Sequence, residues 1–541
     1  MKPLELTYSR ERMRRHDGRV DACIVGCGAG GSMLAKALAE AGWSVVVLEA
    51  GEWLSTDDDL RQDELEMLGK FDWDDRRWLQ GTEQLELGHR RDGRGVGGGT
   101  IHFGAVALRL WPEDFERRRR DGVGADWPIS YRELAPYYER VEHELRLCGP
   151  ETMPWGPKRT AYPQPPHRTT ARDHVVAAGM AKLGIEWVPT PLAILTGAHE
   201  GRSPCMNYGY CQWGCKSRAK SSMHVSVVPK AVRAGAEVRP DARAVQLEVD
   251  ATGRATGVVY VQEGTTHRQT ADLVILSAFC IENPRLLLHS ATNEFPHGLA
   301  NLSGTVGKYL LAHVADSHFG RFADPIHMWS TAPGTLLSQH HYGTKQGRGF
   351  AGGWSWLTSC LFPAEFCETL ARVGEGMWGE TLVEQLERYP NFTVLGTEGE
   401  CLPYETNRVE LTDEVDEFGV PRPLVTFDFH ENEKAMREEI HGFGRRILEA
   451  AGAAEVLVSE GNDHTMGGCR MGDDATSSVV DRTLKAHDHP NLYICDASVF
   501  PTSGGAQPSQ TIMALALRLA DHLTSGRATA ARSGRSAHHA A

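Results

Sequence analysis

The sequence predicts a Rossmann-like α/β domain that binds a dinucleotide, together with a separate domain of α+β type. A strand, a glycine-rich turn, a helix and a second strand follow one another in Val20–Gly51. Strand and helix patterns alternate again over Val225–Arg285, and dense glycine followed by a long amphipathic helix returns in His464–Leu523. A chain of 541 residues is also too long for one compact core, which indicates more than one domain.

The segment Val20–Gly51 has the elements of a nucleotide-binding unit in the right order. Its apolar run Ala22–Val25 has the length and composition of a strand. A helix is expected over Ser32–Ala41, ending at Gly42, and a second strand over Val45–Leu48.

Three glycines and one acidic residue give this unit its predicted chemistry, and they are Gly26, Gly28, Gly31 and Glu49. In such a turn the first glycine permits a tight bend, the second lets the backbone approach a pyrophosphate, and the third allows close packing. The phosphates then lie at a helix N-terminus, where free N–H groups favour negative charge. Glu49 lies at the distance expected of a ribose-binding acid.

Composition excludes several classes of partner. The net charge of −14 argues against nucleic acid or an anionic membrane surface. No apolar run approaches the ~20 residues of a membrane span, and the basic N-terminus lacks the apolar core of a secretory signal. Twelve cysteines in so long a chain predict free thiols in a reducing compartment, so we expect a cytoplasmic protein. Export with a partner subunit stays open.

Two terminal segments and one charged run complete the outline. Residues 1–18 are polar and basic and are expected to form an N-terminal arm, whereas residues 524–541 are of low complexity and predict a disordered tail. The Arg117–Arg120 run is most simply a solvated helix face.

Four separated segments together resemble one family, the glucose–methanol–choline (GMC) flavin oxidoreductases. GCGAGGS…VVVLEAG resembles the FAD fingerprint of that family, and VGGGTIHFGAVALR resembles its flavin-ring segment. VGKYLLAH, at Val306–His313, resembles its connecting motif, and HTMGGCRMG…GGAQPSQTIMALALRLADHL resembles its C-terminal signature. The likeness is greatest to the gluconate, sorbitol and FAD-glucose dehydrogenase branch and to sugar-alcohol enzymes of antibiotic biosynthesis.

The resemblance implies an FAD-binding α/β domain (Rossmann-like, GMC type) interleaved with an α+β substrate domain. The FAD domain would comprise 19–110, 205–300 and 464–523, and the substrate domain 111–204 and 301–463. The implied activity is oxidation of a sugar or sugar-like alcohol by hydride transfer to the flavin. An aminoglycoside hydroxyl is one such substrate, because acidic surroundings suit a polycation.

His464 is the residue that matches the catalytic histidine of the family. Alcohol oxidation needs a base for the hydroxyl proton, and histidine titrates in a useful range. The second member of the family's catalytic pair is a histidine or asparagine, and here Gln507 stands in its place. An amide can orient a hydroxyl but cannot act as a base, so proton abstraction is expected to depend on His464.

Further residues match positions that contact the flavin in the family. Pro508 is expected at the start of a helix whose N-terminus points at the flavin. Asp496 matches a position near the cofactor, although a turn or cap role is equally compatible with the residue. Gly98 and Thr100 belong to the flavin-ring segment, as does His102. Several relatives join a histidine at the position of His102 covalently to the flavin methyl group, and we favour that bond over simple packing.

Cys205, Cys211 and Cys215 are spaced C-x5-C-x3-C. Three thiolates from one loop suit an iron–sulfur cluster better than zinc, which prefers four ligands. Glucose dehydrogenases of this branch carry a [3Fe-4S] cluster on similar spacing, which implies a small subunit or cytochrome as electron acceptor. Thiols without a cluster remain the other interpretation.

Two alternative functions, from other classes of protein, stay open. Gln507 is compatible with a catalytically silent flavoprotein that senses redox state. An NAD-dependent dehydrogenase would also use the glycine fingerprint, but the C-terminal signature has no role there.

Overall fold

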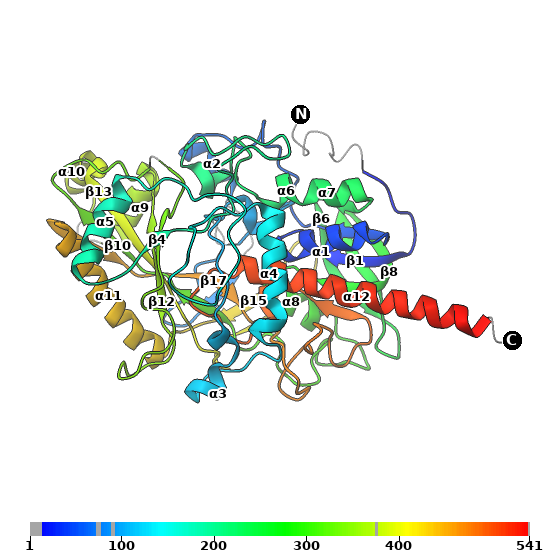
Figure 1. Cartoon of the computed structure of the whole chain (residues 1–541). Helices are drawn as coiled ribbons and strands as arrows, with labels where there is room; N and C mark the ends of the chain where they lie inside the picture. Colours follow the sequence, from blue (N-terminus) through cyan, green and yellow to red (C-terminus); the bar gives the residue numbers. More distant parts are fainter. Residues whose placement is uncertain (1–12, 72–76, 88–91, 330, 374–376, 539–541) are drawn as a thin grey trace.

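The structure is a computed structural model that describes residues 13–71, 77–87, 92–329, 331–373 and 377–538. Two β-sheets with their own helices form two parts of the molecule, which Figure 1 shows side by side. Helix α4 (Tyr131–Leu145) lies between the two parts in that view. No helix in the described ranges is both long and apolar enough to cross a membrane.

The first sheet has a parallel core in the order β5, β2, β1, β8, β18. These strands are β1 (Val20–Val25), β2 (Val45–Leu48), β5 (Glu237–Arg239), β8 (Thr265–Leu276) and β18 (Leu492–Ile494). Nearly every residue of β1 and β2 is buried, as expected of parallel strands covered on both faces. The sheet therefore joins three separated segments of the chain.

The first half of β8 continues this sheet in the antiparallel direction. It pairs with β7 (Ala255–Gln262), which pairs with β6 (Ala242–Val249). Helix α1 (Ala29–Glu40) packs on β1 and β2, and α7 (Val228–Ala234) and α12 (Ser509–His538) pack against α1.

Helix α1 begins three residues before the predicted start at Ser32. The reason is close packing, since a Cβ on Gly30 would lie 2.2 Å from the carbonyl oxygen of Cys495. Gly30 and Gly31 thus belong to the helix, whereas Gly28 is its N-cap and Gly26 lies in the turn ahead of it.

Helix α12 also differs from expectation at its C-terminal end. The segment 524–541 was predicted to be disordered, but α12 continues as far as His538 and projects beyond the rest of the molecule (Figure 1). Alanine and arginine, which are frequent in this segment, favour helix, so low complexity does not prevent continuation. Residues 539–541 lie outside the described residues.

The second sheet is mainly antiparallel and runs in the order β16, β10, β13, β12, β11, β4. Its strands are β4 (Val188–Pro189), β10 (Ser317–Arg321), β11 (Leu336–Ser338), β12 (Trp354–Ser359), β13 (Phe392–Gly399) and β16 (Glu455–Ser459). Two further strands, β9 (Leu311–Val314) and β17 (Asn462–Met466), pair with each other, and β9 also pairs with β13. Helices α5 (Ala171–Lys182) and α11 (Glu431–Ala451) pack together against this sheet.

Two elements depart from the predicted partition into domains. Strand β3 (Trp78–Gln80), from the segment 19–110, pairs with β15 (Pro421–Thr426), which pairs with β14 (Arg408–Val415) in a third sheet. Helix α4, from the segment 111–204, packs against α12 of the nucleotide-binding part. Sequence pattern places an element in the chain but does not say which neighbour covers it.

The remaining helices are short. They are α2 (Glu64–Lys70), α3 (Arg117–Asp121), α6 (Met223–Ser226), α8 (Glu282–His289), α9 (Pro363–Val373) and α10 (Glu380–Glu387).

Residues 1–12 of the predicted arm lie outside the described residues. Two contacts join residues 13–18 to β5. The His16 backbone N–H donates to Glu237 Oε2 at 2.7 Å, and the Val238 N–H contacts Met13 Sδ at 3.3 Å.

Candidate active site

A cavity of about 540 Å³ lies between the carboxyl ends of the parallel strands and the second sheet. Ligands of open α/β sheets bind at this end of the strands, and the volume is typical of small-molecule sites. Residues predicted from sequence that line it are Gly26, Gly28, Glu49, Gly98, Thr100, His102, His464, Asp496 and Gln507.

The turn between β1 and α1 forms one wall of the cavity. Gly26 has φ +98°, and a Cβ there would lie 2.2 Å from the carbonyl oxygen of Ser277. A Cβ on Gly31 would lie 2.0 Å from the carbonyl oxygen of Gly26. Gly28 caps α1 without a side chain, and the first turn of α1 has no acidic residue. The exposed amides therefore fit the pyrophosphate of a dinucleotide.

Glu49 follows β2 and is almost fully buried at 6% exposure. Its Oε2 accepts from the Cys27 N–H at 2.8 Å, and its Oε1 accepts from the N–H groups of Gly51 and Gly95 at 3.0 and 3.1 Å. Burial raises the pKa of Glu49, although these backbone donors oppose the rise. Three fixed hydrogen bonds hold the carboxylate rigidly at the cavity wall.

The glycine-dense segment crosses the same wall. A Cβ on Gly98 would lie 2.7 Å from the Cα of Gly28, so the two glycine turns meet without side chains between them. The Thr100 hydroxyl donates to the Gly97 carbonyl at 2.6 Å and accepts from the Met223 N–H at 2.9 Å. Thr100 thus fixes the turn against α6 as well as lining the cavity.

His102 lies in this segment and is only 7% exposed. Its ring centroid is 5.6 Å from that of Phe71. On either side of it, the carbonyl oxygens of Ile101 and Phe103 accept from Lys220 Nζ at 2.6 and 3.1 Å. Burial lowers the pKa of Lys220 to about 8, against the influence of two nearby thiols. The backbone that carries His102 is therefore anchored from both sides.

Asp496 combines the two roles that its sequence left open. Its Oδ1 accepts from the N–H of Ser498 at 2.9 Å, which caps a short 3-10 helix. Its Oδ2 accepts from the Phe279 N–H at 2.9 Å and from Asn283 Nδ2 at 2.8 Å. Burial raises the pKa of Asp496 despite these donors. The residue is a structural cap that also lines the cavity.

His464 lies on a bulge of strand β17. Asp463 pairs with His313 on β9, whereas Met466 pairs with Leu311, so β17 has one extra residue between the two pairs. His464 itself has φ +56°, which is unusual for a residue other than glycine. Bulges re-aim side chains next to functional sites, and this one directs His464 to the cavity.

Three side chains meet at the Nδ1 atom of His464. It lies 3.1 Å from Glu398 Oε2 and 3.1 Å from His313 Nδ1, and Glu398 Oε2 is 3.3 Å from His313 Nδ1. The other ring nitrogen of His313, Nε2, lies 2.8 Å from the carbonyl oxygen of Gly504. A carbonyl only accepts, so Nε2 of His313 carries a proton.

This arrangement determines the tautomer of His464. The Glu398 carboxylate can only accept, so the neutral His464 ring has its proton on Nδ1. The lone pair of the neutral ring is then on Nε2. Burial would raise the pKa of Glu398, but the charges and hydrogen bonds of His464 and His313 hold it well below its usual range.

The same three ligand atoms lie within 4.8 Å of one another, close enough to hold a metal ion. The hydrogen bonds above account for their proximity without one. Within the described ranges, no other group of three or more histidine, cysteine or acidic side chains is as tightly gathered.

Gln507 lines the same cavity and is 6% exposed. Among the described residues, no protein group pairs with its buried Oε1. Pro508 follows, and its carbonyl accepts from the Ile512 N–H at 3.0 Å, so α12 begins at Ser509 and not at the predicted proline. The N-terminus of α12 therefore meets the cavity next to an amide that lacks a partner.

The three cysteines of the loop are not part of the cavity lining, although Gln212 between them is. Cys211 is buried, and Cys205 and Cys215 are half-buried. Cys205 Sγ contacts Asn207 Oδ1 at 3.8 Å, and Cys215 Sγ contacts Ser217 Oγ at 3.5 Å. Burial raises the pKa of Cys205 and of Cys211, which favours protonated thiols unless a metal binds. The cluster stays a prediction.

Comparison with known families agrees with this geometry. Two family models described as GMC oxidoreductase match residues 36–315 and residues 403–516. The chain belongs to the GMC oxidoreductase family. As a member of this family it binds FAD and oxidises alcohol groups, which favours a flavin enzyme over the NAD-dependent alternative.

Individual relatives of this GMC oxidoreductase differ in substrate. It is 32% identical to 2-methyl-1,2-propanediol dehydrogenase of Mycolicibacterium austroafricanum, over 94% of this chain and 95% of that protein. It is 31% identical to paromamine 6'-oxidase of Streptomyces fradiae, over 94% of this chain and 92% of that protein. The crystal structure of pyridoxine 4-oxidase from Mesorbium loti has the same fold, with a TM-score of 0.65 and 18% identity over 93% of this chain and 98% of that one.

Sequence reasoning missed two members of the polar group around His464. His313 is the last residue of the connecting motif, so the sequence could have singled it out. Nothing in the sequence indicates that it contacts His464. Glu398 lies in β13 among apolar residues, and no local pattern distinguishes it from other strand acids.

Proposed function

We propose that this enzyme oxidises a hydroxyl of a sugar or sugar-like alcohol, with His464 as the base and FAD as the hydride acceptor. The observation that carries the proposal is the hydrogen-bonded group at His464 Nδ1. The Glu398 carboxylate accepts there at 3.1 Å, and His313 Nδ1 lies 3.3 Å from the same oxygen, which supports a lone pair on Nε2 of His464 in the cavity.

The proton steps follow from this arrangement. The substrate hydroxyl gives its proton to His464 Nε2, and the alcohol carbon loses a hydride, so an aldehyde or ketone is formed. The ring then carries a positive charge, and the half-buried Glu398 carboxylate next to Nδ1 stabilises it. When bound, FAD supplies the two-electron acceptor for that hydride.

The residues present fit the cofactor. Gly26, Gly28 and the uncapped start of α1 would hold the pyrophosphate, and Glu49 would accept from a ribose. A side chain at Gly98 would clash with Gly28, which supports close passage of a ligand over both glycines. His102 would lie against the flavin ring, where a covalent bond to the flavin methyl remains our proposal.

Gln507 would orient the substrate. Its buried Oε1 has no pairing group among the described residues and can accept from a substrate hydroxyl. It cannot take a proton as a base, which assigns that role to His464.

The substrate class that we favour is a sugar-like alcohol carrying amino groups. Four acidic residues from the segments outside the nucleotide-binding part, Asp316, Glu365, Glu398 and Asp463, line the cavity. They favour a cation over a neutral polyol. The similarity to paromamine 6'-oxidase supports the same choice.

Anaerobic stopped-flow measurement of flavin bleaching tests both parts of the proposal. The panel compares simple polyols, neutral sugars, an aminoglycoside with a primary hydroxyl, and the same aminoglycoside after N-acetylation. We expect rapid bleaching by the aminoglycoside and at least a tenfold loss of kcat/KM after N-acetylation, which removes charge but keeps the hydroxyl. Equal rates would contradict the amino-sugar assignment, and no bleaching by any alcohol would favour a silent flavoprotein.

A further inference from the structure

The segment 502–505, which leads directly to Gln507, is held by a hydrogen bond at every residue. The Thr502 hydroxyl donates to the carbonyl of Asp114 at 3.1 Å. Ser503 Oγ accepts from the Cys401 N–H at 2.9 Å and donates to the Cys401 carbonyl at 3.2 Å. The first half of the segment is thus joined to two distant parts of the chain.

The second half is held in the same way. The Gly504 carbonyl is bound by His313, as described above, and the Gly505 carbonyl accepts from Ser355 Oγ at 2.7 Å. The Gly505 N–H donates to the hydroxyl of Tyr342 at 3.2 Å. Gly504 has φ +61°, and a Cβ there would lie 2.4 Å from Leu110, so only glycine fits.

Tyr342 joins this segment to a buried carboxylate. Its hydroxyl donates to Asp114 Oδ2 at 2.7 Å while it accepts from Gly505. Its ring stacks on Trp111 with centroids 4.3 Å apart. Burial and the neighbouring Asp114 raise the pKa of Tyr342 well above its usual value, so the hydroxyl remains a donor.

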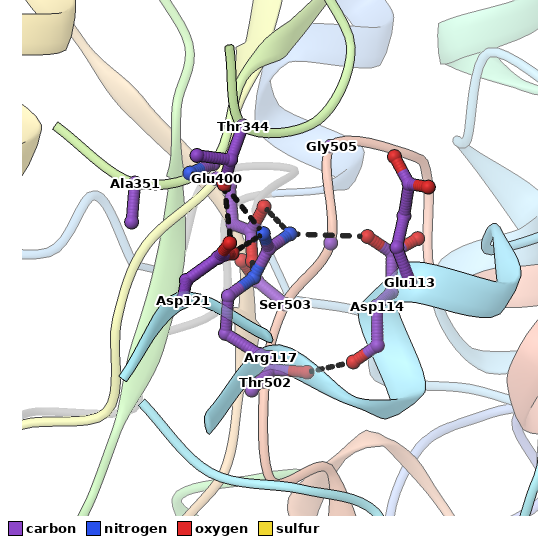
Figure 2. Close-up of polar contacts among 12 residues, drawn as sticks. Glu113, Asp114, Arg117, Asp121, Thr344, Ala351, Glu400, Thr502, Ser503 and Gly505 are labelled. Atoms are coloured by element: carbon purple, nitrogen blue, oxygen red, sulfur yellow. Dashed lines mark hydrogen bonds and ion pairs between the residues drawn. The ribbon is translucent and has the colours of Figure 1, made fainter. Parts of the chain in front are cut away.

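Asp114 is in turn fixed by a buried arginine (Figure 2). Arg117 donates from Nε and Nη2 to the two carboxylate oxygens of Glu400 at 2.8 and 2.6 Å, and from Nη2 to Asp114 Oδ1 at 3.3 Å. Its Nη1 binds Asp121 and the Thr344 hydroxyl. Arg117 is 1% exposed, so the predicted solvated face is wrong at its first residue.

The burial of this group explains its rigidity. One guanidinium faces the carboxylates of Asp114, Asp121 and Glu400, and a bidentate pair has a defined geometry. Removing Arg117 would leave these carboxylates without their shared counter-charge, which is strongly destabilising. The group therefore holds Asp114, and through it Tyr342, in one position.

We propose that Tyr342 is a positioning residue that connects the Arg117 group to Gly505 and so holds the Gln507 amide at the substrate hydroxyl. The inference rests on the proposed role of Gln507. Tyr342 is not part of the cavity lining and acts only through the segment 502–505.

Tyr342→Phe tests this, because it keeps the stacked ring and removes the hydroxyl that joins Asp114 to Gly505. In the FAD-loaded enzyme we expect flavin reduction at saturating substrate to slow roughly tenfold, the size of one lost hydrogen bond, with a smaller change in substrate Kd. Tyr260→Phe is the matched control, since Tyr260 is also buried but its hydroxyl accepts from Arg239 at 2.8 Å, away from this segment. We expect the control to reduce its flavin at the wild-type rate.

The same substitution in a Gln507→Ala background distinguishes positioning from general destabilisation. If Tyr342 acts through Gln507, Tyr342→Phe slows the wild-type enzyme but changes the Gln507→Ala enzyme less than twofold. An equal loss in both backgrounds would overturn the inference, and so would a Tyr342→Phe enzyme with the wild-type rate.

Two further results distinguish a failure of this inference from a failure of the proposed role of Gln507. A Gln507→Ala enzyme with the wild-type rate would overturn the proposed role of Gln507 and this inference together, whereas a slow Gln507→Ala with an unaffected Tyr342→Phe would overturn the inference alone. If Tyr342→Phe does not fold, Ser355→Ala removes the second hydrogen bond to Gly505. That variant should show the same dependence on Gln507, and a loss independent of Gln507 would count against the inference.

Discussion

Glu398 and Glu400, two residues apart at the end of β13, bind two different side chains, a histidine and an arginine. Glu398 Oε2 lies 3.1 Å from His464 Nδ1, and Glu400 Oε2 lies 2.6 Å from Arg117 Nη2. Alternate residues of a strand share a face, but β13 ends at Gly399, so the chain has left the strand before Glu400. One short piece of chain thus contacts both the proposed base and the anchor of the Gln507 segment.

Loss of the imidazole should remove proton abstraction and leave FAD binding intact. We expect His464→Ala to slow flavin reduction by roughly 10²- to 10⁴-fold, the usual contribution of a general base, with a nearly native flavin spectrum. Gln507→Ala, measured beside it, should cost only about 1 to 2 kcal/mol, the value of one hydrogen bond. Near wild-type reduction by His464→Ala would show that another group is the base.

Glu398→Gln tests whether flavin reduction depends on the negative charge of Glu398 and not only on the size of its side chain. Glutamine keeps the size of the side chain but cannot stabilise the charged imidazole, and its NH₂ group favours the wrong tautomer. Flavin reduction should therefore fall by about 10²-fold or more, with unchanged FAD content. Glu414→Gln, a strand acid exposed to solvent, is the control and should leave the rate unchanged. Equal rates for the two variants would refute the role of Glu398.

The Arg117 group predicts a pH dependence of stability. Burial raises the pKa of Glu400 from 4.5 to about 7, with a further rise from Asp114, and raises the pKa of Asp114 from 3.8 to about 6, with a further rise from Glu113. Between the unfolded and folded pKa values the folded protein holds protons that the unfolded chain releases. The stabilisation is therefore complete at low pH and is lost as pH rises, by up to about 1.4 kcal/mol per pH unit for each proton.

Glu400→Gln removes one of these titrations. The Tm of the wild type minus that of Glu400→Gln, at a fixed scan rate, should decrease as pH rises from about 5 to about 8. Glu414→Gln again serves as the control and should show a constant difference from the wild type. A Tm difference for Glu400→Gln that is independent of pH would contradict the raised pKa of Glu400.

The sequence was sufficient for features governed by local rules. Gly26 and Gly31 are required by local backbone geometry, because Gly26 has φ +98° and a Cβ on Gly31 would lie 2.0 Å from the Gly26 carbonyl oxygen, so their spacing alone predicts them. His464 was found through a motif. Its partners were not, because Glu398 is 66 and His313 is 151 residues away from it, and only the pairing of β9 with β13 and β17 brings them together.

Arg117 is a residue for which the local sequence led to the wrong prediction, because its partner is also distant in the chain. A run of four arginines is usually a solvated face, and the local sequence contains nothing that distinguishes its first member. Its main partner, Glu400, is 283 residues later in the chain. A buried charge is predictable only when its counter-charge is known, and that knowledge requires the tertiary fold.

Covalent attachment of the flavin at His102 has a direct test. Acid precipitation of the wild type should leave a yellow pellet, and His102→Ala should release the colour to the supernatant. The anchored backbone on both sides of His102 favours this, since it fixes the ring at the cavity wall. His167→Ala, which alters another buried histidine that is not in the cavity lining, should keep the pellet yellow. A colourless wild-type pellet would show that FAD is bound without a bond.

The cysteine loop gives the last prediction. Ligation of iron requires thiolates, whereas burial raises the pKa of Cys205 and Cys211, so a cluster would have to displace protons from both. If Cys205, Cys211 and Cys215 hold a [3Fe-4S] cluster, the purified enzyme should contain iron and acid-labile sulfide together. Cys211→Ser should then lose iron and slow electron transfer to a one-electron dye more than it slows flavin reduction. Cys148→Ser, which alters a buried thiol that contacts the Leu192 carbonyl at 3.3 Å, should retain both. Iron-free enzyme that reduces the dye at the full rate would assign these residues a structural role, and electrons would then leave the flavin directly.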